Sequence, residues 1–321
     1  MQKKKSQSIT KFKMKSTAVF KFLIAALCGL SYAPAFAFYV NVVESKTSSG
    51  AQGPLYSQSG PATTSSKSSA GPLSGWTGGG LTGVGSWFAG ETTPSKTGDW
   101  SFTPDATHGG YYNVYATWFL PTAAQTPAAP PTWTVHNAGA DVNISLAQNS
   151  GANGWNLLGS GLKYNASTTY TTRLGTSISA ETGKRTFFDS VAWAAATPTA
   201  VVNTAPPNGA TGIPTTGPGN DLSWTAGANN SFFDVFLDIN PTPTTLVSGN
   251  QTGTTFDPDS VPLLDGTTYY WSVTAKNVDR TAAGTVWSFT TAEVPEPSAM
   301  ALSLLGGFGL AVGAIARRRK A

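Results

Sequence analysis

The sequence predicts an all-β fold made of two β-sandwich modules, flanked by an N-terminal signal peptide and a C-terminal transmembrane helix. Between Phe38 and Glu293, short β-branched and aromatic runs alternate with clusters of Gly, Pro and Asn. This is the pattern of short strands joined by turns. No convincing amphipathic helix interrupts that span. Two apolar stretches, one near each end of the chain, account for the flanking segments.

Residues 1–37 have the three parts of a secretory signal peptide. Seven lysines form a basic region, Phe22–Leu30 is apolar, and Ala35-Phe36-Ala37 is a cleavage site of small residues. Signal peptidase is therefore expected to cut after Ala37. The long basic region leaves open whether translation starts at Met1 or Met14.

The exported part of the chain is free of thiols and mildly acidic. The single cysteine, Cys28, lies in the signal peptide, which excludes disulfides, cysteine zinc sites and thiol nucleophiles. The span Phe38–Glu293 holds nine Lys and Arg against fifteen Asp and Glu, a net charge near −6, although the whole chain carries +4. The basic residues belong to the two ends, so we expect no nucleic-acid partner, which would need a basic domain.

Residues 38–75 are expected to form one strand followed by a mobile arm. Tyr39–Val43 is the predicted strand, and the stretch Ser45–Gly75 is dominated by Ser, Gly, Thr, Ala and Pro. Such a stretch has too few large apolar residues to bury. The alternative is that the strand is loose as well, and that the folded domain begins near Trp76.

Residues 76–194 have the pattern of a first sandwich. Its best-defined strand is Gly110–Pro121, and successive side chains of a strand point to opposite faces. One face should therefore carry Tyr112, Val114, Ala116 and Trp118. The other should carry Tyr111, Asn113, Tyr115, Thr117 and Phe119.

Four short motifs follow one another in this module. They are Gly110-Tyr-Tyr-Asn-Val114, Trp133-Thr-Val-His136, Trp155-Asn-Leu-Leu158-Gly159 and Asp189-Ser-Val191. In this order they resemble the golvesin/xanthan-lyase carbohydrate-binding-like domain. The resemblance implies a β-sandwich that binds polysaccharide without cleaving it. Relatives often carry an Arg in the loop before the Trp133 strand, and this chain has none there.

The first module is rich in aromatic rings, with seven of the ten tryptophans between Phe38 and Ala194. Rings are the main filler of small cores, so we expect most of them to be buried, Trp118, Trp155 and Trp193 among them. Sugars also stack on flat exposed rings. The candidates for such a sugar platform are Trp87, Phe88, Trp100, Tyr111, Tyr115 and Phe119.

Residues 195–200 form a small, Pro-bearing linker, and residues 201–292 have the pattern of a second sandwich. Leu263-Leu-Asp-Gly-Thr-Thr-Tyr-Tyr-Trp-Ser-Val273 resembles the fibronectin type III pattern, in which a Gly-Thr-x-Tyr corner precedes a long strand. The resemblance implies that the hydroxyl of Tyr269 bonds to upstream backbone. We interpret this module as a spacer, and a second ligand-binding module is the alternative.

Residues 294–321 have three parts: Val294-Pro295-Glu296-Pro297, the uncharged apolar stretch 299–316, and the basic tail Arg317-Arg318-Arg319-Lys320. Eighteen helical residues span about 27 Å, close to a bilayer core. The tail resembles the PEP-CTERM sorting signal of Gram-negative bacteria, which implies export, a transient inner-membrane anchor and an exosortase-type protease. An ordinary membrane anchor is the alternative. Whether the helix is finally removed is left open.

The sequence predicts no metal, no cofactor and no enzymatic activity. The exported span has two histidines, His108 and His136, and no catalytic or nucleotide-binding motif. Asp257-Pro-Asp259 is interpreted as a solvated turn, with a calcium site as the alternative. We therefore expect non-catalytic attachment to extracellular polysaccharide. A purely structural matrix component and a glycan hydrolase or lyase are the alternatives.

Overall fold

The computed structural model describes residues 39–59, 63–65, 86–90, 96–119, 125, 128–149, 154–176 and 183–293. The predicted signal peptide and the C-terminal segment 294–321 lie outside these residues. Within them the chain is built of strands and turns, with a short 3-10 turn at Pro258–Ser260. The all-β prediction is therefore confirmed.

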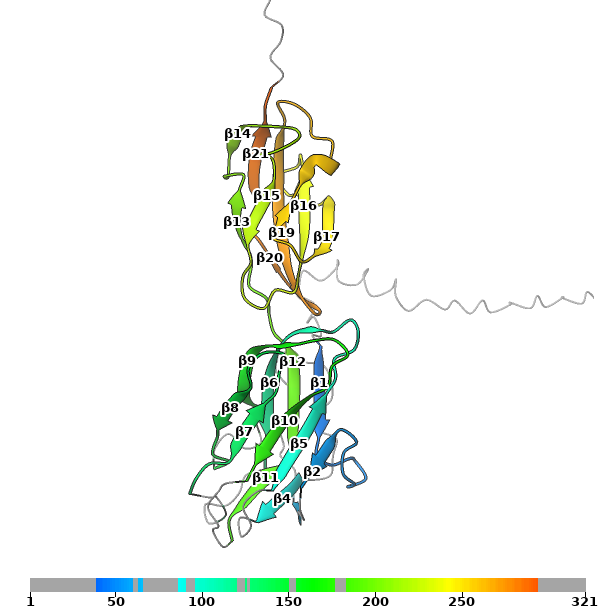
Figure 1. The fold of residues 1–321 in the computed structure, drawn as a ribbon, viewed down its shortest axis with the longest axis vertical. Helices are drawn as coiled ribbons and strands as arrows, with labels where there is room; N and C mark the ends of the chain where they lie inside the picture. Colours follow the sequence, from blue (N-terminus) through cyan, green and yellow to red (C-terminus); the bar gives the residue numbers. More distant parts are fainter. Residues whose placement is uncertain are drawn as a thin grey trace, which may run out of the picture. The chain divides into compact units, whose positions relative to one another are not determined.

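The first sandwich contains two principal sheets (Figure 1). The four-stranded sheet has the order β1 (Val40–Glu44), β12 (Ser190–Ala195), β6 (Gly110–Thr117) and β9 (Asn156–Tyr164). The five-stranded sheet has the order β2 (Tyr56–Gln58), β5 (Thr97–Phe102), β10 (Tyr170–Gly175), β7 (Thr132–Val135) and β8 (Val142–Ser145). A small third sheet pairs β11 (Arg185–Phe188), β4 (Ser86–Gly90) and β3 (Thr63–Ser65).

Aromatic rings fill the first core. Trp100, Trp118, Trp133 and Trp193 are completely buried, and the rings of Phe102 and Trp193 stack with centroids 5.0 Å apart. Offset and edge-to-face ring contacts of this kind add to the free energy gained by burying their area. The predicted alternation in β6 is found as far as Ala116, because Tyr112, Val114 and Ala116 are buried while the residues between them are partly exposed. Trp118, just beyond β6, is buried as predicted, and Thr117, predicted for the other face, is buried as well.

Part of the segment predicted to be a mobile arm belongs to the first sandwich. β1 pairs with β12, and Val43 is buried in the core. Immediately after β1, Ser45 donates hydrogen bonds from its backbone N–H to Asp189 O (2.7 Å) and from its hydroxyl to Phe188 O (2.7 Å). The loop then leads into β2, which pairs with β5. A sandwich starting near Trp76 would lack these strands, so that alternative is wrong.

The second sandwich also has two sheets. The smaller consists of β13 (Val202–Ala205), β15 (Leu222–Thr225) and β18 (Thr255–Phe256). The larger has the order β14 (Ala210–Ile213), β21 (Trp287–Thr291), β19 (Thr268–Asn277), β16 (Phe232–Asp238) and β17 (Leu246–Gln251), with β20 (Arg280–Ala283) paired to the far end of β19. Trp271, Val273 and Phe289 are completely buried between these sheets.

The tyrosine corner predicted for this sandwich is confirmed. The backbone N–H of Leu264 donates a 2.9 Å hydrogen bond to the Tyr269 hydroxyl, which ties the turn before β19 to the strand itself. Phe233, Val235 and Leu237 are buried in alternation along β16. These features support the fibronectin type III-like fold of this module.

Candidate functional site

The outer face of the β1-β12-β6-β9 sheet carries half-buried aromatic side chains. In β6 the residues Tyr111, Asn113 and Tyr115 point away from the core and are partly exposed. This is the face that the alternation in the sequence predicted for them. Because Tyr111 and Tyr115 are four residues apart on one strand, about 13 Å separates their positions.

An apolar strip crosses all four strands at the level of Tyr115. Register places Tyr115 opposite Ala192 in β12 and opposite Leu157 in β9, and Ala192 opposite Val42 in β1. The small side chains of Ala192 and Ala194 form the floor, and Val40, Val42, Tyr115 and Trp155 pack against them. Leu157 is 49% exposed. We call this strip, together with Tyr111 further along the same face of β6, the outer platform.

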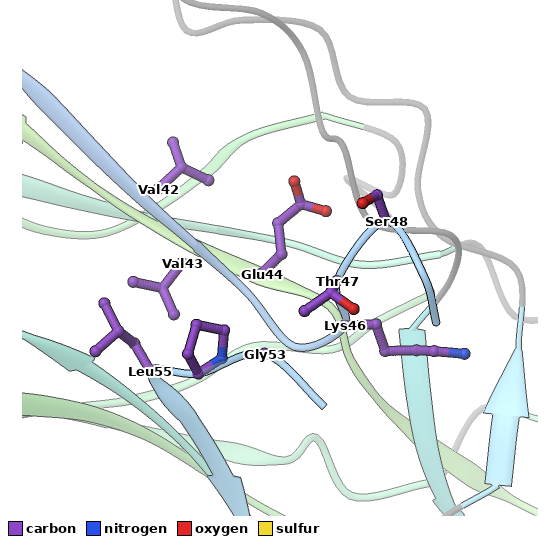
Figure 2. A pocket seen from close by; sticks show the side chains of 9 residues that line it. Val42, Val43, Glu44, Lys46, Thr47, Ser48, Gly53 and Leu55 are labelled. Carbon is purple, nitrogen blue, oxygen red and sulfur yellow. The ribbon is translucent and has the colours of Figure 1, made fainter. Parts of the chain in front are cut away.

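A hollow of about 310 Å³ lies at the β1 edge of the same sheet. Val42, Glu44, Thr47, Ser48, Pro54 and Leu55 are among the residues that line it. Figure 2 shows the Glu44 carboxylate and the Ser48 hydroxyl near one another above the loop backbone, with Val43 and Leu55 on the opposite side. Since Val42 belongs to both the hollow and the outer platform, the two are continuous.

Trp87 does not lie on the outer platform but packs against the loop that follows β1. Its indole Nε1 donates a 3.1 Å hydrogen bond to Ser45 O, and the Lys46 ammonium lies 5.1 Å from the ring centroid. Lys46 is only 5% exposed, and in Figure 2 its side chain leads away from Glu44 and Leu55. One face of Trp87 is therefore covered by a cation–π contact that fixes the loop after β1.

The other predicted platform residues do not come together. Trp100 is fully buried, and its ring packs against those of Tyr56 and Trp133. An exposed role for Trp100 is therefore wrong. Phe119 is half-buried against Phe187, with ring centroids 6.0 Å apart, and Phe88 lies in β4 opposite Phe187 of β11. Of the predicted residues whose side chains the structure describes, only Tyr111 and Tyr115 lie on the outer platform.

Trp155 belongs to the outer platform, although we expected it, from the sequence, to be a buried residue of the core. It is half-buried and packs on Ala192, Ala194 and Tyr115. A shift of register between β6 and β9 near Val114 sets where the start of β9 falls along β6. No local signal in the sequence reports that shift.

In the described segments, the acidic residues and the histidines are held in turns and pairs and are not gathered around a metal site. No cluster of three or more His, Cys, Asp or Glu that could hold a metal is found in the part of the chain that the structure describes. Asp257 accepts a 2.9 Å hydrogen bond from the Asp259 N–H, and Asp259 accepts from Gly217 N and Asn220 Nδ2. The Asp257-Pro-Asp259 segment is thus a hydrogen-bonded turn. His136 pairs with Asp141 at 2.9 Å.

A charged turn before β6 gives the first testable prediction. The backbone N–H and hydroxyl of Thr107, with the ring of His108, donate to the Asp105 carboxylate and lower its pKa from 3.8 to about 2. A depressed pKa stabilises the fold above the unfolded value and stops doing so as pH falls towards the folded value. We expect the melting temperature to fall less between pH 4.5 and 2 in Asp105→Asn than in the wild type. Asp265→Asn, at another exposed turn, is the control. Identical pH profiles for Asp105→Asn and the wild type would contradict this role.

The comparisons with known proteins bear on the C-terminal segment and on the fold. Residues 293–320 match the family model of the PEP-CTERM protein-sorting motif. The motif implies an exported, surface-associated protein that is sorted through a membrane-anchored step by exosortase-type machinery. Among the residues that the structure describes, no helix is long and apolar enough to cross a membrane. None of the curated proteins matches the chain in sequence.

Several solved structures are similar at low identity. A β-1,2-glucanase from Parabacteroides distasonis shows 11% identity over 74% of this chain, with a TM-score of 0.23, and the match spans 37% of the glucanase. The adhesin domain of Epf from Streptococcus pyogenes shows 9% identity over 66% of this chain and 78% of its own, with a TM-score of 0.31.

A two-domain fibronectin type III segment of chicken tenascin shows 12% identity over 64% of this chain and 97% of its own, with a TM-score of 0.26. At these scores, none of the three similarities carries a conclusion about activity or ligand.

Proposed function

We propose that this exported protein attaches non-covalently to extracellular polysaccharide through the outer platform of its first sandwich. The observation that carries the proposal is the flat strip formed by Tyr115, Trp155 and Leu157 over Ala192 and Ala194. Aromatic rings on a small-residue floor offer the apolar surface on which a sugar ring can stack. The adjoining hollow adds the Glu44 carboxylate and the hydroxyls of Thr47 and Ser48 as partners for sugar hydroxyls.

We also propose that attachment is non-catalytic. Most glycoside hydrolases use two carboxylates about 5–9.5 Å apart. Glu44 is the one carboxylate among the described residues that line the hollow, and none of the residues that make up the outer platform is acidic. The proposal includes the assignment of the first sandwich to a golvesin-like carbohydrate-binding fold, which is inferred from the four sequence motifs.

The test is retardation of the exported, purified protein in native gels that contain one polysaccharide each. Hydroxyethylcellulose, laminarin, xylan, alginate and xanthan are suitable probes. In the gel that retards the wild type most, Tyr115→Ala and Trp155→Ala should each raise the dissociation constant about tenfold, or about 1.4 kcal/mol. Tyr111→Ala and Trp87→Ala should have smaller effects, because Tyr111 lies at the end of the platform and one face of Trp87 is covered.

Tyr270→Ala is the matched control, because Tyr270 is a half-exposed tyrosine on β19 of the second sandwich. It should leave retardation unchanged. Absence of retardation in every gel would favour the purely structural alternative. Release of new reducing ends from any of the polysaccharides would contradict the non-catalytic proposal and favour a hydrolase.

A further inference from the structure

The second sandwich contacts the end of β6 that carries Tyr111, and both sandwiches belong to one compact unit of the chain. The contact comes from the turn between β19 and β20. Asn277 is completely buried. Its Nδ2 donates to Tyr111 O (2.9 Å) and Ala196 O (2.6 Å), and its Oδ1 accepts from the Tyr111 N–H (2.9 Å). The next residue, Val278, packs against the first core.

Gly110 permits this close approach. A Cβ at Gly110 would lie 2.6 Å from Asn277 Oδ1 and 2.8 Å from a methyl carbon of Val278. A side chain there would force the side chains of Asn277 and Val278 to shift, and with Asn277 its hydrogen bonds to Tyr111. The backbone at the start of β6 is therefore fitted to the β19–β20 turn, and the position of Tyr111 depends on both modules.

A second hollow, of about 370 Å³, lies beside this contact and has walls from both sandwiches. Its residues from the first sandwich include Tyr111, Lys163 and Asn165, and those from the second include Asn230, Ser231 and Phe232. Pockets occur preferentially at such domain boundaries. We call it the junction hollow.

Polar and aromatic groups of the junction hollow suit a polyhydroxylated ligand. Phe232 is 37% exposed, although it is a large apolar residue. Lys163 lies opposite Tyr111 in the β6–β9 pair and is exposed. Amide, hydroxyl, ammonium and ring together provide donors, acceptors and a stacking surface. A purely apolar ligand would leave the polar groups without partners.

Asn230 adds an unsatisfied group. Its Oδ1 and Nδ2 are both buried and have no hydrogen-bond partner within the described structure. Leaving a buried polar group unpaired costs about 1–3 kcal/mol. A sugar hydroxyl can accept from the nitrogen and donate to the oxygen, once the side chain turns towards the hollow.

Tyr111 lines the junction hollow and lies on the same face of β6 as Tyr115, about 13 Å along the strand, so one extended glycan can reach both. We propose that the junction hollow is a second glycan subsite, in which the fibronectin-like module supplies Asn230, Ser231 and Phe232 to the same polysaccharide chain that lies on the outer platform. This proposal rests on the proposed function. It replaces the interpretation of the second sandwich as a spacer with its alternative, a ligand-binding role.

The test uses the polysaccharide gel that retards the wild type most. Phe232→Ala and Asn230→Ala should each weaken retardation at least fivefold. Asn230→Ala also removes two unsatisfied polar atoms, so its melting temperature should be equal to or higher than that of the wild type. Loss of retardation without loss of stability separates a ligand contact from a structural one. Leu264→Ala, which removes a 63% exposed side chain elsewhere in the second sandwich, is the control and should change neither quantity.

Hydrogen exchange gives an independent measurement. Saturating polysaccharide should slow amide exchange in residues 163–166 and 230–232, in addition to the strands of the outer platform. The subsite proposal is overturned if Tyr115→Ala weakens retardation while Phe232→Ala and Asn230→Ala do not, or if residues 230–232 gain no protection. If no gel retards the wild type, the proposed function fails and the subsite fails with it.

Discussion

Trp100→Ala should destabilise the protein by about 3–5 kcal/mol, the range for removing a large aromatic side chain from a core. Trp100 is fully buried, with ring centroids 5.1 Å from Tyr56 and 5.5 Å from Trp133. Its Nε1 also donates to Asp189 O at 3.3 Å. The substitution leaves a cavity between two sheets and removes one of two hydrogen bonds to Asp189 O, which keeps the bond from the Ser45 N–H. The surrounding strands can close that cavity only in part.

Chemical denaturation followed by tryptophan fluorescence measures the change in the free energy of unfolding. Trp100→Phe keeps a ring in the site and should lose less stability, while its retardation by polysaccharide should equal that of the wild type. If Trp100→Ala unfolded like the wild type but lost retardation, Trp100 would be an exposed platform residue after all. That result would overturn the assignment of Trp100 to the core.

The sequence of β5 contained a signal for the burial of Trp100. Gly98, Trp100 and Phe102 alternate with Thr97, Asp99 and Ser101, and the structure buries the first three. Trp100 was nevertheless among the candidates for an exposed ring. Gly98 serves packing in the strand, because a Cβ there would lie 2.6 Å from a Phe188 ring carbon. Glycine in a strand often marks such a close approach rather than a loop.

Local sequence patterns predicted the structural features that depend on residues close together in the chain. The two faces of β6 follow from period-two alternation. The tyrosine corner joins Leu264 in a turn to Tyr269 in the next strand, only five residues later. Pairings between distant segments were not predictable in the same way. β1 joins β12 through contacts such as Val42 with Ala192, about 150 residues further along the chain. The loop after β1 is fixed by hydrogen bonds to Phe188 and Asp189, and not by contacts among its own residues. The composition of the loop does not report those distant partners, and it therefore suggested a mobile arm.

The contact between the two sandwiches could not be predicted from the sequence for the same reason. Asn277 is one polar residue at the end of a long strand, and nothing near it in the sequence indicates burial. Its partners, Tyr111 and Ala196, lie 166 and 81 residues away. The linker at residues 195–200 suggested independent modules. The structure instead places a hydrogen-bonded contact directly beside the linker.

Asn277→Ala should therefore cost about 3 kcal/mol, since two backbone groups lose a hydrogen-bond partner and a third loses one of its two. The Tyr111 N–H and the Ala196 C=O lose their bonds to Asn277, and the Tyr111 C=O keeps only its bond from the Ala196 N–H. Loss of the contact should also uncouple the two sandwiches, so that one unfolding transition becomes two. Calorimetry and denaturation with separate probes in each module measure both effects. Asn240→Ala, which removes an exposed amide bonded to Asp238, is the matched control and should stay within about 0.5 kcal/mol of the wild type.

The same substitution links stability to binding. If the junction hollow holds glycan, Asn277→Ala should weaken retardation by polysaccharide about as much as Phe232→Ala does, because the walls of the hollow are no longer held together. Asn277→Asp keeps the acceptor for the Tyr111 N–H but replaces two donor bonds with negative charge facing carbonyl oxygens. It should be no more stable than Asn277→Ala. An Asn277→Ala protein with wild-type stability and a single transition would show that this contact does not couple the modules.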